Sequence, residues 1–146
     1  MVGLILIAVS AVAVGFKAAA RLTARRRALS TLLLAFSEIA SRIQLREERN
    51  IILSKVFSEP FTVIQGDDTT ISVTCSALDK GDNDLLCEFT QKLGLGDVNS
   101  QLELCNAYGE LIKKCMADAE HKERQKAGMY RTCGVLAAAA LVVLLI

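Results

Sequence analysis

Two apolar runs, one near each end of the chain, restrict the possible folds more than any other feature of the sequence. The run Val2–Phe16 has fifteen uncharged residues, and the run Cys133–Ile146 has fourteen. A helix rises about 1.5 Å per residue, so each run reaches much of the way through a hydrocarbon core of roughly 30 Å. We therefore expect an N-terminal transmembrane helix over 1–20, a helical domain over 21–132 and a C-terminal transmembrane helix over 133–146.

Basic residues flank both runs on the side that faces the middle of the chain. They are Lys17, Arg21, Arg25, Arg26 and Arg27 after the first run, and Lys126 and Arg131 before the second. By the positive-inside rule, this pattern predicts a cytoplasmic middle domain, with the basic side chains at the lipid headgroups. The net charge is only +1, and because phosphate binding requires a concentrated basic surface, we expect no nucleic-acid partner.

A cleavable signal peptide is the competing interpretation of the first run, and it would make this a secreted helical protein. Ala18, Ala19 and Ala20 resemble a small-residue cleavage site. However, a signal peptide carries positive charge before its apolar run, and here only the N-terminal amine precedes it. The flanking charges therefore favour a retained membrane segment.

The middle of the chain is typical of an all-α helical bundle. Apolar residues recur at helical spacing over Arg21–Ile43, with Leu29 and Phe36 on the predicted buried face. No glycine or proline falls between Lys17 and Arg49, so this helix is expected to continue directly from the first apolar run. Asn50 is predicted to cap a short helix that ends before Pro60.

The segment 61–78 fits two structures. Phe61–Gln65 and Thr70–Cys75 are rich in β-branched residues on either side of Gly66-Asp67-Asp68, a pattern typical of a hairpin. In a chain that is helical elsewhere, Asp68 could instead cap a helix over Thr69–Leu78. We favour the helix and keep the hairpin as the alternative.

Two further helices follow, joined by a glycine-rich corner. Asp82 or Asn83 is predicted to cap a helix that ends at Gly94, and Asp97 is predicted to cap a long last helix. The predicted buried face of the last helix is Val98, Leu102, Cys105, Tyr108, Ile112, Cys115 and Ala119. Since both chain ends would enter one membrane from the same side, this helix should run antiparallel to the first and pack against it.

Candidate chemistry is sparse. The five cysteines lack CxxC spacing, and the only histidine, His121, is six residues from Cys115, so we expect reduced thiols, no metal site and no cofactor. Gly94-Leu95-Gly96-Asp97 matches the GxGD string of membrane-embedded aspartyl proteases. That mechanism requires a second aspartate sharing a proton within the membrane, whereas this string is flanked by polar residues. A membrane-bound hydrolase is therefore the alternative to a noncatalytic protein.

Several strings, taken in order, resemble one protein family. They are Gly15-Phe16 with Arg21-Leu22 and Arg25; Glu38-Ile39; Leu93-Gly94-Leu95-Gly96-Asp97 with Gln101; and Met129-Tyr130-Arg131 leading into Cys133-Gly134-Val135-Leu136. Together they resemble the stage III sporulation protein AB family of endospore-forming bacteria. The resemblance marks Gly94, Gly96, Asp97 and Gln101 as the structural motif.

The resemblance implies a noncatalytic helical-bundle subunit, similar to the F-protein platform of type II secretion machines. The subunit would belong to the channel-like assembly that links mother cell and forespore. It would lie in the mother-cell membrane around the forespore, with its central domain in the cytoplasm. Its implied partners are other stage III sporulation membrane proteins and a secretion-type ATPase.

Overall fold

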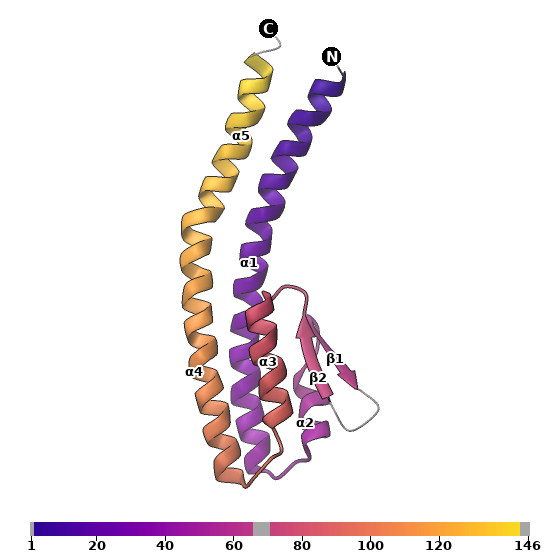
Figure 1. The fold of residues 1–146 in the computed structure, drawn as a ribbon, viewed down its shortest axis with the longest axis vertical. Coiled ribbons are helices and arrows are strands. Elements are labelled where there is room, and N and C mark those ends of the chain that lie inside the picture. Colours follow the sequence, from indigo (N-terminus) through magenta and orange to yellow (C-terminus); the bar gives the residue numbers. More distant parts are fainter. Residues whose placement is uncertain (1, 66–70, 144–146) are drawn as a thin grey trace. The chain divides into compact units, whose positions relative to one another are not determined.

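The computed structural model describes residues 2–65 and 71–143, most of which are helical (Figure 1). In chain order the elements are α1 (Val2–Gln44), α2 (Arg49–Val56), β1 (Phe61–Gln65), β2 (Ile71–Cys75), α3 (Lys80–Lys92), α4 (Val98–Lys122), the π-helical turn η1 (Glu123–Ala127) and α5 (Gly128–Val143). They form two compact units. We call Met1–Arg26 with Asp118–Ile146 the end unit and Arg27–Ala117 the core unit.

The first helix is continuous, as the sequence predicts. α1 extends from Val2 through the three adjacent arginines Arg25–Arg27 to Gln44, and the chain turns at Arg46, whose φ is 57°. Leu29 and Phe36 are both buried, with 0% and 5% of their surfaces exposed, so the predicted buried face of this helix is confirmed.

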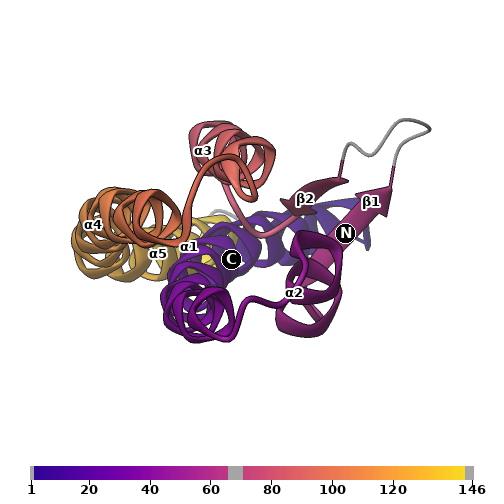
Figure 2. The ribbon, with the colours of Figure 1, turned by 90° about the horizontal axis from the view of Figure 1, so that it is seen from below.

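An aromatic cluster joins three helices in the core unit. The ring of Phe89 on α3 lies 4.4 Å from that of Phe36 on α1 and 5.5 Å from that of Tyr108 on α4, measured between centroids. Within this unit α1 and α4 run side by side in opposite directions (Figures 1 and 2). Cys105, Tyr108 and Ile112 are buried on α4, as its apolar spacing predicts. Offset and edge-to-face ring pairs contribute roughly 0.5–1.5 kcal/mol each beyond area burial, so this cluster is a main contact of the bundle.

The segment after α2 is a β-hairpin, and the predicted helix over Thr69–Leu78 is wrong. β1 and β2 pair antiparallel, from Phe61 opposite Cys75 to Gln65 opposite Ile71. Ile71, Val73 and Cys75 are buried, whereas the two residues between them are partly exposed. This period of two buries one face of a strand and would not bury one face of a helix. The fold is therefore not purely α, and residues 66–70, which include the predicted turn, lie outside the described residues.

Two helices begin before their predicted caps. α2 starts at Arg49, so Asn50 lies inside the helix rather than at its cap. α3 starts at Lys80 after a capping box, in which the Asp79 side chain accepts the backbone N–H of Asp82, and Asp82 Oδ2 accepts the Asp79 N–H at 3.4 Å. Asn83 is therefore not the cap of α3, and its side chain binds the backbone of Cys75 in the hairpin instead.

Among the described residues, no helix is long and apolar enough to cross a membrane. The predicted transmembrane helices over 1–20 and 133–146 are therefore not supported. The apolar run in α1 stops at Lys17 after fifteen residues. A membrane-crossing helix requires about 20 apolar residues.

The end unit brings α1 and α5 close together at Gly15. A Cβ atom placed on Gly15 would lie 2.9 Å from the carbonyl oxygen of Tyr130 and 3.7 Å from Cα of Gly134. Real Cβ atoms do not approach a backbone oxygen so closely, so this position requires glycine.

Candidate interaction site at the corner between α3 and α4

The motif residues form a sharp corner between two helices of the core unit. Gly94 and Gly96 have φ values of +88° and +96°, a region that residues with a Cβ rarely adopt. The Leu93 N–H donates to the Phe89 carbonyl at 2.9 Å, and the Leu95 N–H donates to the Lys92 carbonyl at 3.2 Å. The glycines thus let the chain reverse within five residues while the last turn of α3 keeps its hydrogen bonds.

Arg49, at the start of α2, closes the end of α3. Its Nη2 donates to the Thr90 carbonyl at 2.7 Å, where the negative end of the helix dipole favours a cation. The Arg49 side chain also lies against Gly94, and a Cβ on that glycine would be 3.0 Å from Arg49 Cδ. Gly94 is therefore required for two reasons, its backbone conformation and the space that Arg49 occupies.

Asp97 caps the N-terminus of α4. Its Oδ1 accepts the Ser100 N–H at 3.3 Å and also accepts a hydrogen bond from the Ser100 hydroxyl. The hydroxyl bond, and after it the backbone bond, hold the pKa of the Asp97 carboxyl below its ordinary value. Gln101 Nε2 donates to the Gly96 carbonyl at 3.2 Å and fastens the corner to the first turn of α4. All four motif residues thus serve one corner.

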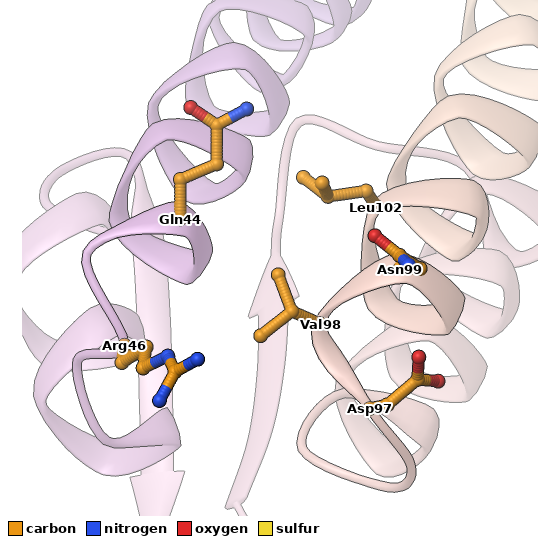
Figure 3. A pocket seen from close by; sticks show the side chains of 6 residues that line it. All are labelled: Gln44, Arg46, Asp97, Val98, Asn99 and Leu102. Atoms are coloured by element: carbon orange, nitrogen blue, oxygen red, sulfur yellow. The ribbon is translucent and has the colours of Figure 1, made fainter.

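A pocket of about 560 Å³ opens beside this corner, between the end of α1 and the start of α4 (Figure 3). Gln44 and Arg46 line it from one side, and Val98 and Leu102 point toward them from α4 (Figure 3). Asn99 and Asp97 complete the lining. Sequence reasoning identified Asp97 and missed Gln44, Arg46 and Asn99, because only the packing of α1 against α4 brings them together.

The pocket and its surroundings offer little chemistry. Within the described lining, Asp97 is the only carboxylate, and its carboxylate is bonded to its own helix through Ser100. Over the described parts of the chain, no cluster of histidine, cysteine, aspartate and glutamate could hold a metal ion. Burial raises the pKa of the Cys105 thiol to about 11, which makes it a weak nucleophile at neutral pH. The arrangement is suited to contacts rather than to proton transfer.

Two exposed leucines lie in the turns beside this pocket. Leu45 is 73% exposed in the turn after α1, and Leu95 is 68% exposed between the two corner glycines. Both belong to the core unit, and each directly adjoins residues that line the pocket or form the corner. The turn after α1 and the corner before α4 thus each expose one large apolar side chain.

Some of the predicted flanking basic residues form ion pairs within the protein, and others are exposed. Arg25 is buried and pairs with Asp118 at 3.5 Å, and Arg26 Nε pairs with Glu123 Oε2 at 2.5 Å. Thr23 Oγ1 also donates to Glu123 Oε1, at 2.7 Å, so the π-helical turn begins at a carboxylate held by α1. Lys17, Arg21, Arg27 and Lys126 are exposed, and the side chain of Arg131 lies outside the described residues. The role of these side chains at lipid headgroups remains a prediction, and for Arg25 burial in an ion pair opposes it.

The fold and the site define a mostly helical protein in which the predicted motif residues form a helix corner beside an open pocket. A family described as stage III sporulation protein AB matches residues 69–146. The match covers more than half of the chain, so this protein belongs to the stage III sporulation protein AB family, and the predicted family is confirmed. Membership gives the protein a role in stage III of sporulation. No curated protein matches the chain, and no solved structure does.

Proposed function

We propose that this protein is a noncatalytic subunit of the assembly that links mother cell and forespore during endospore formation. The observation that carries the proposal is the corner between α3 and α4. The predicted motif residues Gly94, Gly96, Asp97 and Gln101 provide backbone conformation and helix capping there. A motif that builds a helix corner rather than a reaction centre fits an assembly role.

The proposed location is the mother-cell membrane around the forespore, with the central domain in the cytoplasm. Exposed apolar side chains in the end unit support contact with a membrane or with membrane proteins: Val14, Phe16, Met129, Val135 and Leu136 are 52–68% exposed. Such side chains gain free energy when they leave water. The proposed partners are other stage III sporulation membrane proteins and a secretion-type ATPase, in an arrangement similar to a secretion platform.

Substitutions at Asp97 distinguish this function from the alternative, a membrane-bound GxGD-type hydrolase. A hydrolase requires an ionisable aspartate, whereas asparagine caps a helix about as well as aspartate does. We expect Asp97→Asn to support sporulation at the normal frequency in an endospore-forming host that lacks the native gene. Leu95 is 68% exposed at the corner, so Leu95→Asp would place a charge where we propose that a partner subunit makes contact, and it should lower sporulation without lowering the amount of protein.

The two functions give opposite results in this experiment. A normally abundant, folded Asp97→Asn protein that fails to support sporulation would favour the hydrolase and overturn the noncatalytic assignment. Separation of membranes from cytosol in sporulating cells tests the location. Recovery of the full chain in the cytosolic fraction would contradict the proposed place at the membrane.

A further inference from the structure

The β-hairpin of the core unit has one outer edge, and it belongs to β1. The sheet of the described residues contains only β1 and β2, and β2 lies between β1 and α3 (Figures 1 and 2). The side of β1 that faces away from β2 therefore carries no neighbouring strand.

Asn83 shows which backbone groups point along each edge. Its Oδ1 accepts the Cys75 N–H at 2.9 Å, and its Nδ2 donates to the Cys75 carbonyl at 3.0 Å. Both backbone groups of Cys75 thus point toward α3 and away from β1. The Phe61 N–H donates to the Ser58 carbonyl at 3.0 Å, which also directs it away from β2. Phe61 and Cys75, which are opposite each other, are therefore a pair without mutual hydrogen bonds.

This alternation fixes the edge at Val63. Pairs with and without mutual hydrogen bonds alternate along an antiparallel ladder, so Val63 and Val73 also form a pair without them. The N–H and C=O of Val63 consequently point to the outer side of β1. An edge of this kind is a template for an added strand.

The side chains beside this edge are uncharged. Thr62 and Ile64 are exposed, and opposite them on the same face are Thr74 and Ser72. Ile64 alone is 52% exposed. An edge strand that has to remain unpaired usually carries a charge or a bulge, and β1 has neither a charged residue nor a proline within its five residues. A β-branched strand placed beside it would cover Ile64.

The net charge of the chain segment that contains the hairpin favours a particular partner. Asn50–Cys115 contains five Lys/Arg and ten Asp/Glu, and Glu59 lies two residues before β1. A second copy of β1 would bring its own acidic neighbours to this edge, where like charges repel. A strand flanked by lysine or arginine would meet opposite charge instead.

We propose that the outer edge of β1 is a docking site for an extended segment of a partner protein, uncharged and β-branched in its centre and flanked by basic residues. The segment would pair with the N–H and C=O of Val63 and extend the hairpin to three strands. This proposal does not depend on the sporulation role, because it rests on the hairpin alone.

Binding of a fluorescent peptide to the full-length protein tests the proposal. The probe is Lys-Lys-Val-Thr-Val-Thr-Val-Lys-Lys, and its binding is measured by fluorescence anisotropy. Val63→Pro removes the outward N–H and spares the bonds between β1 and β2, so we expect binding to weaken roughly tenfold. Val63→Thr is the matched control, because it keeps both the N–H and the branched shape, and it should bind as the natural protein does.

Modified peptides show whether weaker binding to Val63→Pro comes from the lost N–H or from misfolding of the variant, because the protein itself is unchanged in these measurements. Methylation of alternate backbone nitrogens blocks one edge of the peptide, and methylation of the intervening nitrogens blocks the other. One methylated peptide should keep its affinity and the other should lose it. A probe with glutamate in place of the four lysines should bind more weakly.

Three results would overturn the proposal. They are equal binding to Val63→Pro and to the natural protein at unchanged melting temperature, equal binding of both methylated peptides, and equal binding of the glutamate probe. Concentration-dependent dimerisation that Val63→Pro abolishes would show that a second copy occupies the edge, and it would refute the choice of a basic partner.

Discussion

Gly94 offers the sharpest test of the corner, because two separate costs act on one substitution. In Gly94→Ala the φ of +88° becomes strained, at roughly 1–2 kcal/mol for a residue with a Cβ in left-handed geometry. The new Cβ would also lie 3.0 Å from Arg49 Cδ, so the arginine must shift by a few tenths of an ångström, which strains its hydrogen bond to the Thr90 carbonyl. A hydrogen bond from a charged group contributes about 1.5–3 kcal/mol when it is well shielded, and partial exposure reduces that value.

Alanine substitutions at two other glycines, Gly96 and Gly109, separate the cost of backbone strain from the cost of the contact with Arg49. Gly96→Ala meets similar strain at φ +96°, but its nearest contact, Ser100 Cβ, is at an ordinary 3.5 Å. We therefore expect Gly94→Ala to lower the free energy of unfolding by about 1 kcal/mol more than Gly96→Ala does. Gly109→Ala, on helix α4 with open space around its Cβ, should instead stabilise the protein by about 0.5–1 kcal/mol.

Urea unfolding of the full-length protein in detergent, followed by circular dichroism, measures all three variants. In an Arg49→Ala background, the difference between Gly94→Ala and Gly96→Ala should shrink, because alanine removes the Cδ contact at 3.0 Å and the hydrogen bond to Thr90 but keeps the Cβ contact at 3.3 Å. Equal effects of Gly94→Ala and Gly109→Ala would refute the left-handed corner. An undiminished difference in the Arg49→Ala background would refute the role given to the arginine.

Four further outcomes follow from the same structure. Leu29→Asp should unfold the core unit because Leu29 is fully buried, whereas Leu34→Asp on the same helix, at a position 72% exposed, should leave the melting temperature nearly unchanged; equal melting temperatures would contradict the packing of α1. Gly15→Leu should destabilise the contact of α1 with α5 because its Cβ would meet the Tyr130 carbonyl oxygen at 2.9 Å, and Gly128→Leu, which has open space, is the control in a thermal melt. The lowered pKa of Asp97 stabilises the fold above the unfolded pKa, and this contribution is lost as the pH falls through the lower folded pKa; the stability of Asp97→Asn should therefore fall less steeply below about pH 4 in acid titrations. A thiol reagent should modify exposed Cys133 first and buried Cys75 and Cys105 only after unfolding, and mass spectrometry that found Cys105 modified early would contradict its burial.

Helix position and type could be predicted from the sequence because they depend on local spacing. The apolar residues at helical intervals correctly predicted α1 through Leu29 and Phe36 and the buried face of α4. Gly94 and Asp97 were correctly placed at the end of one helix and the start of the next, since positive φ and helix capping are preferences of single residues.

The hairpin depended on tertiary contacts. The β-branched residues of 61–65 and 70–75 locally indicated a hairpin, and the helix was favoured only because the chain is helical elsewhere. The structure forms the strand because Ile71, Val73 and Cys75 bury one face and Asn83 of α3 binds the backbone of Cys75. No sequence pattern shows that an asparagine eight residues later will hold a strand edge.

The sequence by itself determined the helical frame, the family strings and the charge that separates the basic flanks from an acidic middle. Only the tertiary structure decided which charges are used internally, as in the pairs of Arg25 with Asp118 and Arg26 with Glu123. It also decided which turns meet to form the pocket of Gln44, Arg46 and Leu102. The physical reason is that spacing along one helix fixes which face a residue occupies, whereas ion pairs and pockets depend on which faces of different elements come into contact.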